Sequence, residues 1–294
     1  MVRGRSKVQS FPAAPRLVIE KMASNRSANQ ISVASFSNLL ATADFSMAFM
    51  RPIYLAPSAW LEHIPFAFWL TFRLRPKTVV ELGTYNGCSY FAFCQAVERL
   101  GLATRCYAVD HWKGDEHAGF YSEDVFTRVQ ARNDELYSGF SRLVRSSFDE
   151  AAQHFPKGSI DLLHIDGHHS LGSVQHDFAT WKPLLSDSAI VLLHDTNVRE
   201  RGFGVYEMLE LLRKDYPVFE FDHGHGLGVV SVGGRQNAGI SSLFEITEET
   251  CAHRQIKEFF ARLGRSCADA EAVRRLEAQI SERNARHIPP PPSI

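Results

Sequence analysis

The strongest constraint on the fold of this chain is a regular alternation of short apolar runs with longer amphipathic segments, which begins after Pro76. Short runs of branched and aromatic residues indicate buried strands, and the amphipathic segments between them indicate helices. This alternation is typical of a parallel sheet that is covered by helices on both faces. The expected strands are 78–82, 105–109, 142–144, 160–165, 189–193, 218–221 and 227–232. The expected helices lie near 89–100, 123–136, 148–155, 171–184 and 205–215.

The last two expected strands differ from the others because no helix separates them. Only the residues 222–226, Asp-His-Gly-His-Gly, connect them, and two glycines in so short a segment fit a tight turn. We therefore predict that strand seven runs antiparallel. The predicted fold class is α/β, a Rossmann-like doubly wound sheet of seven strands with N-terminal and C-terminal helical extensions.

Composition divides the chain into three predicted parts. Residues 1–44 are rich in Ser, Ala, Asn and Arg without clear periodicity, which predicts an arm that is partly disordered or helical. Residues 45–235 contain the sheet, preceded by an aromatic-rich stretch at 45–75 that predicts helices packed on the core. Residues 236–294 predict a C-terminal helical extension that ends in a proline-rich tail. Its expected helices are 245–262 and 268–286, and Val273, Leu276 and Ile280 form one apolar stripe that fits either the domain or another chain.

Charge, cysteine content and hydropathy limit the partners and the location. The 32 Lys and Arg residues balance 33 Asp and Glu residues to a net charge of −1, which argues against nucleic acid or an anionic membrane and favours a small molecule. Five scattered cysteines do not make a disulfide framework, so reduced thiols and a cytoplasmic location are expected. The most apolar run, 64–72, is well short of the roughly 20 residues of a membrane span.

A glycine turn follows the first expected strand. Gly83 and Gly87 would let the backbone approach a ligand, and the helix that begins near Ser89 offers free amide groups to a carboxylate or a phosphate. Asp110 ends the second expected strand, where an acidic side chain can accept hydrogen bonds from both ribose hydroxyls of a nucleoside. The turn has no Lys or Arg, and Glu81 precedes it. A cationic cofactor without phosphate therefore fits better than a dinucleotide.

The stretch Glu81-Leu-Gly-Thr-Tyr-Asn-Gly-Cys-Ser89 resembles the first motif of class I S-adenosylmethionine-dependent O-methyltransferases of the catechol O-methyltransferase type. The resemblance implies that the glycine turn, with Tyr85 and Ser89, holds the methionine end of S-adenosylmethionine, and that Asp110 binds its ribose. Three later segments are more similar to the bacterial subfamily grouped with cephalosporin hydroxylase and macrocin O-methyltransferases. They are Val109-Asp-His-Trp-Lys-Gly-Asp115, Ile165-Asp-Gly-His-His169 and Leu193-His-Asp-Thr196.

A metal site is predicted where the fourth and fifth expected strands end, at Asp166 and at the pair His194 and Asp195. Neighbouring parallel strands lie about 4.8 Å apart, so their terminal carboxylates can meet at one cation. Oxygen ligands favour Mg²⁺, and the resemblance also implies a divalent cation on Asp166 and on the pair. His194 replaces an acidic residue of several relatives, which leaves the third ligand open between His194, Thr196 and water and makes Mn²⁺ or Fe²⁺ alternatives. An interpretation without metal, in which the carboxylates only accept hydrogen bonds, stays open.

The resemblance implies a base at His169, three residues after Asp166. An imidazole with an unperturbed pKa near 6.5 is suited to accept a hydroxyl proton near neutral pH. His168 is the alternative base. Among weaker candidates, His223 and His225 fit the acceptor pocket and Trp112 fits stacking near adenine.

The predicted function is that of an S-adenosylmethionine-dependent, divalent-metal-assisted O-methyltransferase that acts on a hydroxyl of a sugar or glycosylated metabolite. The sugar follows from the resemblance, because members of the subfamily are often found near or fused to glycosyltransferases. One alternative is a binding or assembly module of a glycan-processing complex, with a homodimer or a glycosyltransferase held by the C-terminal helices. Another is an NAD-dependent oxidoreductase, which would need a GxGxxG turn that the sequence lacks.

Overall fold

The computed structural model describes residues 45–115, 119–235 and 239–286, so the predicted arm at 1–44 and the proline-rich tail lie outside the described residues. Its main sheet has seven strands in the order β5-β2-β1-β6-β7-β9-β8. These strands are β1 (Thr78–Leu82), β2 (Arg105–Asp110), β5 (Ser141–Arg145), β6 (Ile160–Ile165), β7 (Leu185–His194), β8 (Val218–Phe221) and β9 (Leu227–Ser231). A separate small hairpin pairs β3 (Gly114–Asp115) with β4 (Gly119–Phe120).

The strand pairing confirms the predicted α/β fold. Strands β5, β2, β1, β6 and β7 run parallel, whereas β9 is antiparallel to both of its neighbours, β7 and β8. Three consecutive residues with positive φ, Gly224, His225 and Gly226, close the turn between β8 and β9. The chain leaves β1 toward β2 on one side and returns to β6 on the other side. The carboxyl ends of β1 and β6 therefore flank the crevice where sheets of this kind bind ligands.

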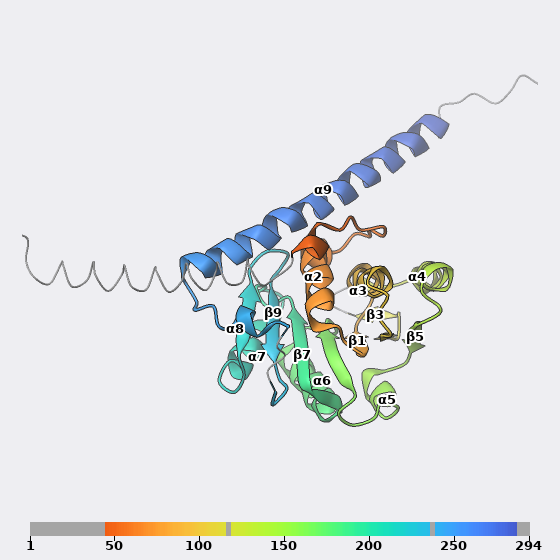
Figure 1. The fold of residues 1–294 in the computed structure, drawn as a ribbon. Coiled ribbons are helices and arrows are strands. Elements are labelled where there is room, and N and C mark those ends of the chain that lie inside the picture. Colours follow the sequence, from red (N-terminus) through yellow and green to blue (C-terminus); the bar gives the residue numbers. More distant parts are fainter. Residues whose placement is uncertain (1–44, 116–118, 236–238, 287–294) are drawn as a thin grey trace, which may run out of the picture.

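Helices cover both faces of the sheet, as Figure 1 shows. One face carries the larger aromatic core, under α2 (Ile64–Leu74), α3 (Cys88–Arg99), α4 (Glu123–Leu136) and α9 (Cys251–Arg286). The other carries α5 (Phe148–Ala152), α6 (Leu171–Trp181) and α7 (Val205–Leu212). The short helices are η1 (Ser46–Phe49), η2 (Ala59–His63), η3 (Lys182–Leu184) and α8 (Ser241–Phe244). No helix in the described ranges is long and apolar enough to cross a membrane.

The C-terminal region differs from the prediction of two helices at 245–262 and 268–286. It forms the short α8 and one long helix, α9, which continues through residues 263–267 between the two predicted helices. A Cβ atom on Gly264 would lie 1.9 Å from the carbonyl oxygen of Glu62 in η2. This glycine therefore permits a close approach of two backbones and does not end the helix. Beyond that contact, α9 extends past the sheet (Figure 1).

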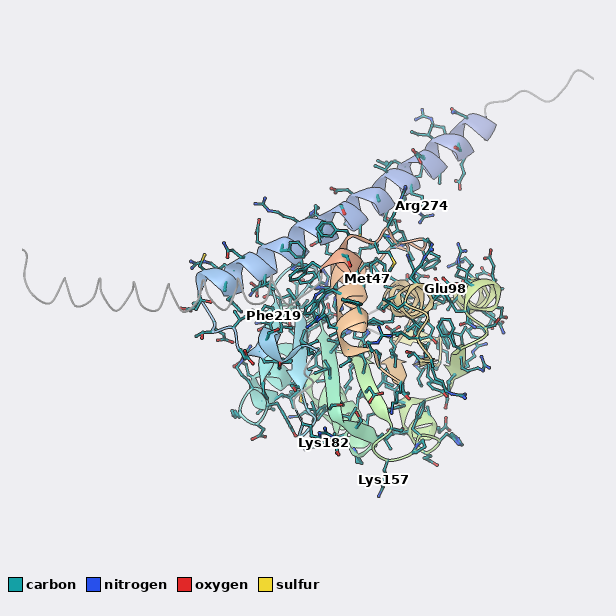
Figure 2. The ribbon with its side chains drawn as sticks, in the orientation of Figure 1. Met47, Glu98, Lys157, Lys182, Phe219 and Arg274 are labelled. Carbon is teal, nitrogen blue, oxygen red and sulfur yellow. The ribbon has the colours of Figure 1, made fainter. Side chains whose placement is uncertain are left out.

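The direction of the strands places their carboxyl ends near η2. Figure 2 shows Lys157 and Lys182, which precede β6 and β7, on the side of the sheet away from α9. Both strands therefore end on the side toward α9, which packs directly on η2 at Gly264. The loops that follow β1, β6 and β7 therefore meet on the side of the sheet toward η2.

Candidate active site

A cavity of about 250 Å³ lies at the carboxyl ends of β1, β6 and β7. The turn after β1, residues 83–86, forms one side of it, together with Ser89 of α3. Asp166, His169, His194 and Asp195, which follow or end β6 and β7, also line it. Parallel strands that end at one edge thus bring the predicted cofactor turn and the predicted metal residues to one cavity.

The glycine turn has the geometry that its sequence requires. Gly83 has a φ of 85°, and a Cβ atom there would lie 2.1 Å from the carbonyl oxygen of Asp166. Gly87 has a φ of 79° and caps α3 without a side-chain hydrogen bond. The first amides of α3, at Cys88 and Ser89, therefore have no side-chain cap and are suited to an anionic group. Tyr85 and Ser89 line the cavity, as predicted for cofactor-binding residues.

Asp110 lies beside the cavity and organises the turn. Its Oδ2 accepts hydrogen bonds from the amides of Thr84 (2.8 Å) and Tyr85 (3.0 Å), and its Oδ1 accepts one from the amide of Trp112 (2.6 Å). A carboxylate offers about four acceptor positions, so some capacity for a ribose hydroxyl remains. The indole of Trp112 is buried and donates to the Tyr85 carbonyl oxygen, 3.0 Å away. Trp112 is not among the cavity-lining residues.

Glu81 is fully buried and does not line the cavity. Its Oε2 lies 2.8 Å from Nδ1 of His164, and the indole of Trp60 donates to Nε2 of the same imidazole at 3.1 Å. An indole N–H can only donate, so Nε2 of His164 carries no proton and Nδ1 donates to Glu81. Burial raises the pKa of the Glu81 carboxyl, although the His164 hydrogen bond opposes this. Glu81 therefore belongs to a buried network, which the sequence did not reveal.

Two carboxylates and two imidazoles meet at the ends of β6 and β7. Nε2 of His169 lies 2.9 Å from Oδ2 of Asp195 and 3.7 Å from Oδ1 of Asp166. Nδ1 of His194 lies 3.2 Å from the same Asp166 oxygen and 3.4 Å from the same Asp195 oxygen. Asp195 adopts a left-handed backbone with a φ of 62°, an uncommon conformation for a residue other than glycine. The four residues predicted for metal and base thus form one cluster.

His194 has one ring nitrogen committed to the backbone. Its Nε2 donates to the carbonyl oxygen of Gly224 at 2.9 Å, and Nε2 of His63 lies 3.1 Å from the same oxygen. Only Nδ1 of His194 faces the carboxylates. Burial disfavours the imidazolium, but Asp166 and Asp195 outweigh it and hold the pKa of His194 well above its usual value. Burial and the charge of His194 hold the pKa of His63 well below its usual value.

The expected unperturbed pKa of His169 does not hold in this environment. Burial disfavours its imidazolium, but hydrogen bonds and charge from Asp166 and Asp195 raise the pKa of His169 to about 9. The ring of Phe203 stacks on the His169 imidazole with centroids 4.4 Å apart and planes 11° apart. The stack fixes the ring plane, and Nε2 is directed at the carboxylates.

The competing histidines separate by position. His168 lies outside the cavity lining, where its Nδ1 is 3.1 Å from the Ser173 hydroxyl at the start of α6. His225 lines the cavity, and its Nδ1 donates to Oδ1 of Asp195 at 3.0 Å. His223 packs on His63 instead, with ring centroids 4.7 Å apart. Thr196, the alternative third ligand, is fully buried and is not among the lining residues.

Sequence reasoning missed part of the cavity wall. The wall also contains Ser58, which caps η2, and Arg201 and Phe203 from the loop after β7. The sequence signal for Phe203 is weak and consists of the flanking glycines Gly202 and Gly204. His63 carries no motif at all, because its proximity to His194 depends on how η2 packs.

The family comparison identifies the part of the chain that contains this cavity. Residues 80–196 match the model of a family described as "Methyltransferase domain". Residues 80–196 of this chain are thus similar to methyltransferase domains. The match includes the glycine turn, Asp110 and the cluster at the ends of β6 and β7, and it stops before the loop that holds Arg201 and Phe203. This match supports the predicted methyltransferase class for residues 80–196.

A curated relative extends the similarity beyond the methyltransferase domain. The chain is 44% identical over 246 residues to the uncharacterised protein y4gI of Sinorhizobium fredii (strain NBRC 101917 / NGR234). The aligned part is 81% of this chain but only 27% of that protein. The chain thus spans about a quarter of the length of this relative.

Two solved structures are similar to this chain at low sequence identity. A putative caffeoyl-CoA O-methyltransferase from Staphylococcus aureus is 14% identical, with a TM-score of 0.47, over 74% of this chain and 97% of that one. The O-methyltransferase TomG from Streptomyces achromogenes, solved with S-adenosylmethionine, is 16% identical, with a TM-score of 0.45, over 71% of this chain and 98% of that one.

Proposed function

We propose that the methyltransferase domain is an S-adenosylmethionine-dependent O-methyltransferase, assisted by a divalent cation, that acts on a hydroxyl of a sugar or glycosylated metabolite. The observation that carries this proposal is the cavity shared by the glycine turn and by Asp166, His169 and Asp195. A methyl donor on the turn and a hydroxyl at the cluster would lie in the same small space. Proximity of this kind is a large part of what a methyl transfer needs.

The turn suits the amino-acid end of the cofactor. The amides of Cys88 and Ser89 at the start of α3 favour a carboxylate through their hydrogen-bonding capacity and the helix dipole. Asp110 retains acceptor capacity for a ribose hydroxyl beside Tyr85. We assign the cofactor-binding role to Gly83, Tyr85, Gly87, Ser89 and Asp110. Glu81 is fully buried outside the cavity lining, so we leave it out of this set.

The cluster has the donor set of a divalent metal site. One ligand atom each of Asp166, His169 and Asp195 lies within 4.8 Å of the others. Nδ1 of His194 is as close to both carboxylates, and its Nε2 hydrogen bond to a backbone carbonyl is the support that metal-binding histidines usually have. Asp166, Asp195 and His194 therefore fit as ligands, with Mg²⁺ preferred by the oxygens and Mn²⁺ or Fe²⁺ by the imidazole. A bound divalent cation would lower the pKa of a coordinated hydroxyl.

His169 is then the base. Its Nε2 faces both carboxylates from the cavity wall, and the stack on Phe203 keeps it there. A bound cation would compensate the charge of Asp166 and Asp195 and so remove the interaction that raises the pKa of His169. Nε2 accepts the hydroxyl proton while the acceptor oxygen forms its bond to the methyl carbon and the carbon–sulfur bond breaks, leaving a neutral thioether.

Titration calorimetry with S-adenosylhomocysteine tests the cofactor. We expect binding, and weaker binding after Ser89→Ala or Asp110→Asn, whereas Asp134→Asn on the exposed side of α4 should bind as the unchanged protein does. Absence of any heat with S-adenosylhomocysteine, together with binding of NADH, would favour the oxidoreductase. Mass spectrometry of glycans and extracts incubated with deuteromethyl-labelled cofactor then identifies the acceptor.

The metal has its own test. We expect the purified protein to contain a divalent cation, EDTA to abolish transfer, and added Mg²⁺ or Mn²⁺ to restore it. Full transfer in EDTA would leave Asp166 and Asp195 as hydrogen-bond acceptors only. The homodimer, the glycosyltransferase partner and the cytoplasmic location stay predictions.

A further inference from the structure

We propose that the acceptor carries an oxyanion, a carboxylate or a phosphate, and that Arg201 binds it. This inference deepens the proposed function, since it concerns the molecule that presents the reacting hydroxyl. It rests on a cation in the cavity wall whose role neither the cofactor nor the metal explains.

Arg201 is the one Lys or Arg among the described residues that line the cavity. Its side chain is exposed, and within the described part of the chain it makes no ion pair with a carboxylate. A guanidinium offers several N–H donors in a planar fork that matches the two oxygens of a carboxylate or a phosphate. Arg201 therefore has the chemistry of an oxyanion receptor and a place at the cavity.

The guanidinium of Arg201 lies one aromatic ring away from the base. Arg201 lies over the ring of Phe203, 5.3 Å from its centroid, and the same ring stacks on His169. The amide of Gly204 donates to the carbonyl oxygen of His169 at 2.8 Å, and a Cβ atom on Gly204 would lie 2.6 Å from the amide nitrogen of Leu171. The loop is thus held to the base through both ring and backbone. An acceptor that contacts both Arg201 and His169 would span the Phe203 ring within the one cavity that both residues line.

The charges in the cavity favour one orientation of such an acceptor. Asp166 and Asp195 are paired with His169 and His194 at the cluster, where the hydroxyl must lie, whereas Arg201 pairs with no carboxylate of the described residues and attracts an anionic group one stacked ring away. The cofactor carboxylate does not need Arg201, because the first amides of α3 can donate hydrogen bonds to it. The acceptor anion is thus the partner that Arg201 lacks.

The test compares matched probes in the presence of saturating S-adenosylhomocysteine. Ligand-observed NMR titrations with the full chain would use glucuronate, glucose 6-phosphate and neutral glucose. We expect at least one anionic probe to bind about tenfold more tightly than glucose, with an affinity that falls as salt rises. Arg201→Gln should remove this difference, and Arg201→Lys should retain part of it because the charge stays but the fork is lost. A preference between glucuronate and glucose 6-phosphate distinguishes carboxylate from phosphate.

Arg262→Gln is the matched control, since its side chain is 79% exposed on α9 and lies outside the cavity lining. It should bind the probes as the unchanged protein does. Equal binding of glucose and both anionic probes, or an anion preference that survives in Arg201→Gln, overturns the proposal. A loss of S-adenosylhomocysteine affinity in Arg201→Gln also overturns it, because Arg201 would then hold the cofactor. If the unchanged protein fails to bind S-adenosylhomocysteine at all, the proposed function fails instead.

Discussion

Individual side chains of the cluster act through their shared charge. Asp166 and Asp195 each approach both His169 and His194, so the protonation of one imidazole depends on the other. Burial disfavours the ionised carboxyl of Asp195, but the neighbouring imidazoles outweigh this and hold its pKa below the usual range. A ligand that changes the charge at this point therefore changes the base as well.

Replacement of His169 by Gln should lower kcat by about 10² to 10⁴-fold, the usual effect of removing a general base. S-adenosylhomocysteine affinity should stay the same, because His169 is not among the residues assigned to the cofactor. Initial rates on the acceptor found with labelled cofactor measure the effect. His168→Gln is the control, as its ring lies at the start of α6 outside the cavity lining. If His168→Gln loses the activity and His169→Gln keeps it, the two roles are reversed.

A second prediction concerns Asp177, which is buried in α6. Burial raises the pKa of its carboxyl to about 6. In the unfolded chain an Asp ionises near pH 3.9, so the folded protein pays a penalty as pH rises from about 4 to about 6. Asp177→Asn removes this penalty. The variant should gain about 2 to 3 kcal/mol of unfolding free energy above pH 6 and close to nothing near pH 4.

Urea unfolding at pH 4, 5 and 7 measures the difference between Asp177→Asn and the unchanged protein. Asp134→Asn, in which an exposed carboxyl of α4 is replaced, should show little change with pH. A gain from Asp177→Asn that is the same at every pH would mean that the Asp177 carboxyl has the same pKa in the folded and the unfolded protein.

Sequence patterns located the strands and most helices, because buried and exposed residues alternate regularly along these elements. Helix α4 has the predicted limits, and Asp166, His169 and Asp195 meet because parallel strands carry their ends to one edge. The prediction of two C-terminal helices was wrong, since the contact that places Gly264 within a continuous helix is with Glu62, about 200 residues away in the sequence. Arg201 was not predicted either, because the packing of a loop, and not a periodic pattern in the sequence, places it in the cavity wall.

The contact between α9 and η2 gives a prediction for Gly264. Gly264→Ala would put a Cβ atom against the Glu62 carbonyl, and overpacking of this kind costs about 1 to 3 kcal/mol. Gly172→Ala is the matched control, because Gly172 also lies in a helix but has open space at its Cβ position. It should be neutral or stabilise by up to about 1 kcal/mol. Equal stability of the two variants in urea unfolding would show that η2 yields without cost.

For the whole molecule, α9 is part of the main core as well as an extension of it. Ala252, Ile256 and Phe260 are buried with the aromatic residues of α2 and the sheet. Arg265 pairs with Glu62 at 3.1 Å, and Lys257 pairs with Asp222, so α9 also holds η2 and the β8–β9 turn. Both elements support the cavity, through His63 and through the carbonyl of Gly224. The first half of α9 thus connects the core to the site.

The second half of α9 has a different environment. Val273, Leu276 and Ile280 are 54%, 56% and 58% exposed, on the part of the helix that extends past the sheet, where Figure 2 labels Arg274. A chain that ends at 274 therefore keeps every buried contact of α9 and loses most of the apolar stripe. A chain that ends at 238 loses both.

Two truncations separate these roles. Ending the chain at 238 removes Ile256 and Phe260, and the loss of even one buried Phe costs about 3 to 5 kcal/mol against a typical total of about 5 to 15, so cooperative unfolding should disappear. Ending it at 274 should leave the melting temperature and S-adenosylhomocysteine affinity close to those of the full chain. Light scattering then compares the oligomeric state of the 274 form with that of the full chain, and a difference between them comes from the apolar stripe. If the 274 form contains fewer chains per particle than the full chain, Leu276 and Ile280 belong to an interface between copies. If both forms contain the same number of chains, the predicted homodimer does not form through this helix.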